Sequence, residues 1–212
     1  MQGIPRAFQK AHKTLSSALY TVFSSNLSDL EIGIPDVFSG FPYYNPANTR
    51  WWNTKVNHRS WVISHADMTR QYFEAHISSP YMHTDHTHCE FLEKIYNTLR
   101  LIWENKDVVL LRGMNNQTYQ YDIFNNCRSI VTLFAPSSQA WGKYLELKKM
   151  LLKEDPSKLY ILSVGPTSRV LVYDLVKEGR RALDLGHLAK DYNRYHLKIH
   201  NEDFWEDTGK PY

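Results

Sequence analysis

The sequence has little of what marks several large protein classes. Only 2 cysteines occur in 212 residues, which is too few for a disulfide framework and fits a reducing cytoplasm. No apolar run approaches the length of a membrane span, and no secretory leader opens the chain. The formal net charge is only +3 and no basic stripe stands out, so we expect no nucleic-acid partner. The glycine fingerprint of nicotinamide-dependent enzymes is also missing, which argues against a Rossmann-type oxidoreductase.

What remains is the composition of an ordinary soluble globular protein, with 42% hydrophobic and 22% charged residues. In the C-terminal half, short apolar runs alternate with helical patterns, which predicts a parallel α/β sheet with right-handed crossovers. The expected strands are 108–111, 129–134, 159–164 and 182–185, and the expected helices between them are 141–152 and 167–178. In the N-terminal half we expect a strand at 31–34 and helices at 1–23, near 51–61, at 66–75 and at 90–103.

These elements predict one Rossmann-like domain, a parallel sheet flanked by helices, over residues 1–197. Residues 36–104 would form a lobe of helices and loops inserted into it, and residues 105–197 the βαβ half. Residues 198–212 lack sustained periodicity and are expected to be a surface tail.

The strand–turn–helix–strand pattern from Leu159 to Tyr195 organises the chain. Its turn offers Thr167 or Ser168 as a helix N-cap. Gly179 stands where a left-handed C-terminal cap needs no Cβ. His187 follows the next strand.

Polar groups follow each predicted strand at its carboxyl end, where open parallel sheets bind ligands. A guanidinium, several hydroxyls, a helix N-terminus and an imidazole together suit a phosphate or pyrophosphate. The same residues are also explained by a purely structural βαβ unit with a turn and a cap, and this alternative stays open. The residues are Arg112, Gly113, Ser137, Ser138, Gly165, Pro166, Thr167, Ser168 and His187.

The segment HTDHTHC, from His83 to Cys89, gathers three histidines, an aspartate and a cysteine. Its spacing matches neither separated ligand pairs nor a helical i, i+4 pair. A polar loop that caps the following helix explains it adequately, so we assign no metal ligands there.

The segment GPTSRVLVYDLVKEGRRALDLGHLAKDY resembles the C-terminal signature of the GT-D fold bacterial glycosyltransferases, which reads roughly GPTATVLAYDL…G…ALDIGH…Y. The resemblance extends to IWENKDVVLL, YDIFNNCRSIVTLFAPSSQAW and EIGIPDVF, and it covers about Phe8 to Tyr195. It implies a GT-D type fold and transfer of a sugar from a nucleotide donor, such as a UDP-sugar, to a glycan or glycoprotein acceptor. Asp184, Gly186, His187 and Asp191 match the signature. The resemblance adds Asp184 and Gly186 to the donor site and makes His187 and Asp191 the candidate catalytic residues, each either as the acceptor-side base or as a residue that orients it.

The resemblance also implies a divalent metal, Mn²⁺ or Mg²⁺, that an Asp-X-Glu motif within RFGDGE would hold. No RFGDGE occurs in this sequence. The one Asp-X-Glu, Asp29-Leu30-Glu31, precedes a strand and is interpreted as a solvated turn. We therefore expect that the chain begins just after the catalytic strand, and the metal ligands stay unknown.

Two hypotheses follow. The chain is a cytoplasmic glycosyltransferase, with attachment at the inner membrane face left open, whose carboxylates come from a longer native chain. Alternatively it is a catalytically impaired relative that binds sugar nucleotides or pairs with a glycosyltransferase or with a second copy of itself.

Overall fold

The computed structural model describes residues 9–38, 40, 42–85, 89–114 and 119–199. The chain divides into two compact units. We call Met1–Leu30, Trp103–Thr118 and Cys127–Gly186 the sheet unit. The helical unit comprises Glu31–Ile102, Tyr119–Asn126 and His187–Tyr212. Each is described by itself.

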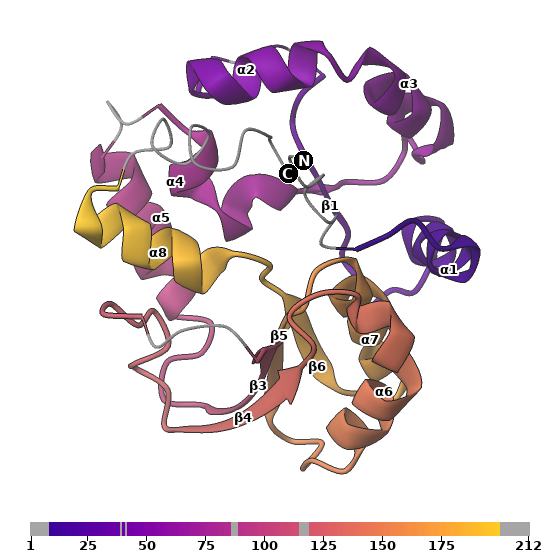
Figure 1. The fold of residues 1–212 in the computed structure, drawn as a ribbon, viewed down its shortest axis with the longest axis vertical. Coiled ribbons are helices and arrows are strands. Elements are labelled where there is room, and N and C mark those ends of the chain that lie inside the picture. The colour runs from indigo at the N-terminus through magenta and orange to yellow at the C-terminus, as the bar shows by residue number, and fades with distance from the viewer. Residues whose placement is uncertain (1–8, 39, 41, 86–88, 115–118, 200–212) are drawn as a thin grey trace, which may run out of the picture. The chain divides into compact units, whose positions relative to one another are not determined.

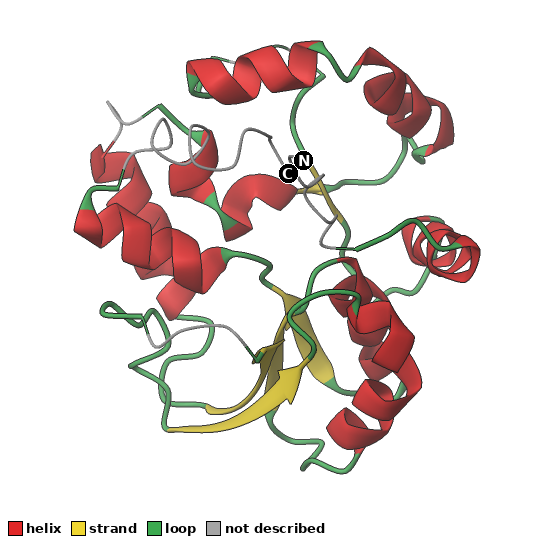
Figure 2. Ribbon diagram, in the orientation of Figure 1, coloured by secondary structure: helices red, strands yellow, loops and turns green. Residues whose placement is uncertain are grey.

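The sheet unit contains the predicted parallel sheet. Its strands are β3 (Asp107–Gly113), β4 (Ser129–Ala135), β5 (Leu159–Ser163) and β6 (Arg181–Asp184), in the order β4-β3-β5-β6. All three pairings are parallel. The α/β fold class expected from the alternating pattern is therefore confirmed (Figure 2).

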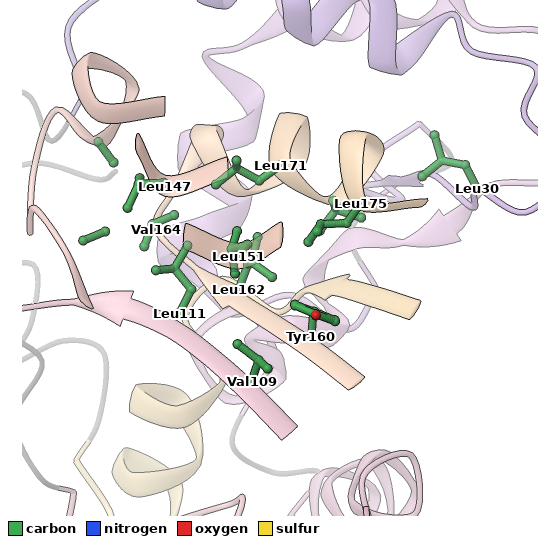
Figure 3. Packing of buried hydrophobic residues seen from close by; sticks show 13 residues of the cluster. Leu30, Val109, Leu111, Leu147, Leu151, Tyr160, Leu162, Val164, Leu171 and Leu175 are labelled. Atoms are coloured by element: carbon green, nitrogen blue, oxygen red, sulfur yellow. The ribbon is translucent and has the colours of Figure 1, made fainter. Parts of the chain in front are cut away.

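Helices cover one face of this sheet (Figure 1). They are α6 (Tyr144–Leu152), which follows the 3-10 turn η3 (Ala140–Lys143), and α7 (Pro166–Lys177). Helix α1 (Lys13–Phe23) packs against α7. Apolar side chains of alternate strand positions meet α6 and α7 in a continuous core (Figure 3). Core members include Val109, Leu111, Leu147, Leu151, Tyr160, Leu162, Leu171 and Leu175. Burying one such side chain stabilises the fold by about 1.5–3 kcal/mol.

The sequence predicts the end of helix α7 correctly but not its beginning. Its C-terminus is the predicted glycine cap, since Gly179 has φ +72° and the N–H groups of Gly179 and Arg180 donate to Val176 O and Leu175 O. Its N-cap is Gly165, so the expectation that Thr167 or Ser168 would cap the helix is wrong. Proline is favoured at the first helical position, and Pro166 therefore starts the helix earlier.

The helical unit contains a two-stranded parallel sheet, β1 (Gly33–Ile34) with β2 (Phe73–Glu74), and five helices besides the short η1 (Ala75–Ser78) in its described part. The helices are α2 (Pro46–Asn53), α3 (Val56–His65), α4 (Pro80–His83), α5 (Cys89–Arg100) and α8 (Leu188–Leu197). Helix α4 packs against both α5 and α8 (Figure 1).

The helix expected at 66–75 is not formed, because turns and β2 occupy these positions. Asp67 Oδ1 accepts hydrogen bonds from both N and Oγ1 of Thr69, at 2.9 and 2.6 Å. This local bonding competes with a helical turn. Along the described part of the chain, no helix has the length and hydropathy to span a bilayer.

Candidate functional site

The order of the strands singles out one position on the sheet. From β3 the chain continues to β4 on one side, and from β5 it continues to β6 on the other side. The carboxyl ends of β3 and β5 therefore form a topological switch point, where open α/β sheets bind ligands in a crevice. Arg112 and Gly113 end β3, and Gly165 to Ser168 follow β5.

The turn between β5 and α7 requires a glycine at position 165. Gly165 has φ +67° and ψ −148°, a conformation that essentially only glycine adopts. Pro166 at the first position of α7 has no N–H, and Ser168 N donates to Gly165 O at 2.9 Å. The N-terminus of the helix carries the positive end of its dipole. Val164 N donates to Ser168 Oγ at 2.8 Å, so this hydroxyl holds the turn in shape.

Two polar side-chain atoms at the switch point are buried and have no hydrogen-bond partner among the described residues. They are Thr167 Oγ1, in a residue that is 0% exposed, and Arg112 Nε. A buried polar atom left without a partner costs about 1–3 kcal/mol. Such atoms are rare in folded proteins, and a functional role is one explanation for them.

The ends of β3 and β4 lie close together. A Cβ placed on Gly113 would come within 3.2 Å of Ser137 Cα, so glycine permits the loop after β4 to approach β3. Met114 N donates to Ala135 O at 2.9 Å and continues this pairing. Ser137 is half-buried and Ser138 is exposed.

Asp184 ends β6 and holds two groups at the same edge. Its Oδ1 accepts a hydrogen bond from Gly186 N at 3.2 Å, and its Oδ2 lies 3.6 Å from Nε of Arg169. Burial raises the pKa of Asp184, against the effect of Arg169. Arg169 is not singled out by the sequence, although it directly follows the GPTS turn. A cation in the first turn of a helix opposes the helix dipole, and here the guanidinium pairs with Asp184.

His187 and Asp191 belong to the helical unit. Asp191 is 0% exposed, and its carboxylate accepts hydrogen bonds from Tyr81 N, Met82 N and Tyr96 Oη at 3.0, 2.9 and 2.6 Å. Burial raises its pKa to about 6, while these hydrogen bonds oppose the rise. The carboxylate thus anchors the start of α4 between α5 and α8.

His187 is the residue before α8. Burial lowers the pKa of His187 to about 4, with a contribution from Lys190 and Arg194. The imidazole is therefore neutral at pH 7.

A second histidine group lies in the helical unit. The rings of His76 and His83 stack with centroids 3.9 Å apart, and Tyr44 Oη lies 2.7 Å from His76 Nδ1. Asn48 Oδ1 is 3.2 Å from His83 Nδ1, and Glu74 Oε1 is 3.4 Å from His76 Nδ1. Burial lowers the pKa of His76 to about 4 and that of His83 well below its usual value.

These histidines predict acid sensitivity of the helical unit. Unfolded histidines bind protons below about pH 6.5, whereas folded His76 and His187 do so only near pH 4. The free energy of unfolding should therefore fall between pH 6.5 and 4, by about 3 kcal/mol for the largely buried His76. His187 is exposed and should contribute less, because solvent screens its interactions. Asp191 and Glu74 have raised pKa values and offset part of this loss. Hydrogen exchange of α4 and α8 across this pH range measures the loss of stability. The loss should be smaller in the His76→Gln variant. Protection from exchange that does not change with pH would contradict the prediction.

The described residues do not fit the divalent metal that the resemblance implied. Across ranges 9–38, 40, 42–85, 89–114 and 119–199, no three His, Cys, Asp or Glu residues are placed to hold an ion. Asp29 and Glu31 are both exposed. Part of the HTDHTHC segment, residues 86–88, lies outside the described residues.

Comparisons with known proteins agree on one family. Residues 1–204 match the family described as "Glycosyltransferase GT-D fold". The chain is 28% identical over 200 residues, 92% of its length, to "Probable glycosyl transferase Gly" of Streptococcus gordonii, and covers 28% of that protein. It is 26% identical over 165 residues, 77% of its length, to "Glycosyltransferase GlyD" of Streptococcus pneumoniae serotype 4 (strain ATCC BAA-334 / TIGR4), and covers 20% of it. The chain thus spans between a fifth and a third of these curated relatives.

Two solved structures are similar throughout most of the chain. One is described as "The highly conserved domain of unknown function 1792 has a distinct glycosyltransferase fold". It has a TM-score of 0.83 and 27% identity, over 90% of this chain and 69% of the other. The second, "A New Glycosyltransferase (DUF1792) from Streptococcus sanguinis", has a TM-score of 0.79 and 28% identity, over 90% of this chain and 72% of the other.

Proposed function

This chain belongs to the glycosyltransferase GT-D fold family, and we propose that it transfers a sugar from a nucleotide-sugar donor to a glycan or glycoprotein acceptor. A UDP-sugar is the donor that we propose to test first. Its diphosphate would bind at the carboxyl ends of β3 and β5.

One observation carries the proposal. Two buried side-chain atoms that have no hydrogen-bond partner among the described residues, Arg112 Nε and Thr167 Oγ1, lie at the topological switch point of the sheet. A diphosphate supplies acceptor oxygens for both of them. The N-terminus of α7 adds positive potential for the same anion.

In the reaction, the bond between the anomeric carbon of the sugar and the diphosphate oxygen breaks. A new bond forms to the acceptor oxygen. The departing diphosphate keeps the electron pair, and its charge is stabilised by fixed donors such as Arg112 and the α7 N-terminus. The proton of the acceptor hydroxyl passes to a general base of the acceptor site, a role to which we assign no residue of the sheet unit.

We propose a different role for Asp191, which the sequence presented as an alternative base. Its carboxylate already accepts three hydrogen bonds in a fully buried position. Asp191 would therefore position α4 without taking part in proton transfer. No step is assigned to a divalent metal, since the described residues offer no ligand set for one.

Two adjacent hydroxyls provide a matched test of the diphosphate site. Thr167→Val removes a buried hydroxyl without a partner in the described part of the chain, so thermal stability should stay equal or rise. Its affinity for UDP should nevertheless fall about tenfold, because a hydrogen bond to a charged phosphate is lost. Ser168→Ala leaves Val164 N without its acceptor and should lower stability by about 1 kcal/mol.

Calorimetric titration with UDP and thermal unfolding measure both quantities. The diphosphate site is wrong if Thr167→Val destabilises the protein and leaves UDP affinity unchanged. Release of UDP from a panel of UDP-sugars, with and without acceptor, then distinguishes an active glycosyltransferase from a catalytically impaired relative. Binding with turnover supports a transferase, whereas binding without turnover supports a subunit that binds sugar nucleotides.

A further inference from the structure

The carboxyl edge of the sheet is apolar on one side of the switch point. Phe134, the penultimate residue of β4, is 50% exposed, and Met114, directly after β3, is 62% exposed. Phe134 is in register with Arg112, whose guanidinium carbon lies 5.8 Å from the centre of the phenyl ring. The exposed ring therefore lies beside a cation that has a buried Nε without a partner in the described residues.

The other side of the switch point is polar. It carries the N-terminus of α7 with Thr167, the guanidinium of Arg169, and the carboxylate of Asp184. None of the exposed large hydrophobic residues among the described residues belongs to β5, β6 or the first turn of α7. The two sides thus suit different chemical groups.

A nucleotide sugar has the same asymmetry, with a flat aromatic base at one end, a hydroxyl-rich sugar at the other and a diphosphate between them. We infer that Phe134 is the platform on which the donor nucleobase stacks, with Met114 beside it, and that the transferred sugar points toward Asp184 on β6. The inference rests on the proposed function, because it takes the diphosphate to lie at the switch point.

The spacing of the strands is compatible with this direction. Strands β4 and β5 flank β3, so they are about 10 Å apart, a separation that a nucleoside diphosphate can bridge. Arg112 on β3 would then lie between base and diphosphate, where its guanidinium can contact both the ring and phosphate oxygens. Stacking on an aromatic face is tolerant of base identity. The platform would therefore favour ligands that carry a nucleobase without distinguishing one base from another.

The strand itself offers a matched control. Ile130 lies on the same face of β4 as Phe134 but at its amino end, in register with Val108, and is 37% exposed. Both side chains are exposed enough for alanine to be tolerated by the fold. Phe134→Tyr keeps an aromatic ring and serves as the conservative variant.

The experiment compares UDP with inorganic pyrophosphate as ligands in calorimetric titrations of the whole chain. Phe134→Ala should weaken UDP binding about tenfold and leave pyrophosphate binding unchanged. Phe134→Tyr should bind UDP about as tightly as the unaltered protein, and Ile130→Ala should leave the affinity for both ligands unchanged. Thermal unfolding of each variant checks that the fold is intact.

Each outcome bears on a separate claim. If the unaltered protein binds UDP and Phe134→Ala binds it equally well, the base platform is wrong and the diphosphate site stands. Equal weakening of UDP and pyrophosphate by Phe134→Ala would also overturn it, because the residue would then act on the phosphates. If the unaltered protein binds neither ligand, the proposed function itself fails.

Discussion

Replacement of Asp191 by alanine is expected to lower the free energy of unfolding of the helical unit by about 4 kcal/mol. The carboxylate is fully buried and accepts from Tyr81 N, Met82 N and Tyr96 Oη. Alanine would leave all three donors buried without an acceptor. Hydrogen exchange of α4, α5 and α8, together with thermal unfolding, measures the loss.

Asp67 provides the control within the same unit. It is exposed, and its carboxylate accepts only from Thr69 in the hydrogen bonds described, so Asp67→Ala should cost less than about 1 kcal/mol. Equal effects of the two substitutions would show that the buried network of Asp191 contributes nothing special.

Asp191→Asn separates an anchoring role from a catalytic one. Asparagine keeps one acceptor oxygen at nearly the same volume but cannot act as a base near neutral pH. If Asp191 is an anchor, the Asp191→Asn variant should be less stable, but the molecules that remain folded should keep the turnover and pH profile of the unaltered protein. A fully folded Asp191→Asn protein without turnover would return Asp191 to the catalytic machinery.

Arg180→Ala is expected to have a similarly large effect on the sheet unit, about 3 kcal/mol. Its guanidinium donates to Leu151 O, Leu152 O and Glu154 O at 3.0, 2.7 and 2.9 Å, and also to Tyr160 Oη. These carbonyls include the last ones of α6, which a cation also stabilises through the helix dipole.

The neighbouring Arg181 makes the comparison direct. It is exposed and donates to Ser157 O at 2.9 Å, so Arg181→Ala should change stability by less than about 1 kcal/mol. Denaturant unfolding of the two alanine variants measures the difference. Arginine at 180 would be dispensable if both variants unfolded at the same denaturant concentration.

Local patterns were enough to predict the parallel sheet and its switch-point residues. The apolar runs that became β3, β4, β5 and β6 are bounded by glycine, proline and serine, so their type and carboxyl ends follow from the sequence. The cap at Gly179 also follows from one residue type. Where Asp67 bonds to Thr69, a local hydrogen bond outweighed an apparent helical pattern, and the expected helix at 66–75 was wrong.

The functions of single side chains could not be predicted, because they depend on residues far away along the chain. Thr167 and Ser168 are equivalent in sequence, yet within the described residues the Oγ of Ser168 has a hydrogen-bond partner and the Oγ1 of Thr167 has none. Asp191 meets Tyr81 and Met82, about a hundred positions earlier, so its burial has no local signal. The stacking of His76 on His83 likewise depends on the fold of the helical unit.

The central claim is that the carboxyl ends of β3 and β5 bind a nucleotide diphosphate, and amide chemical-shift mapping with UDP tests it most directly. The account predicts that the largest shifts occur at Gly113, Thr167, Ser168 and Arg169, and that inorganic pyrophosphate shifts the last three as well. Saturable shifts confined to other residues, with these amides unmoved, would contradict it.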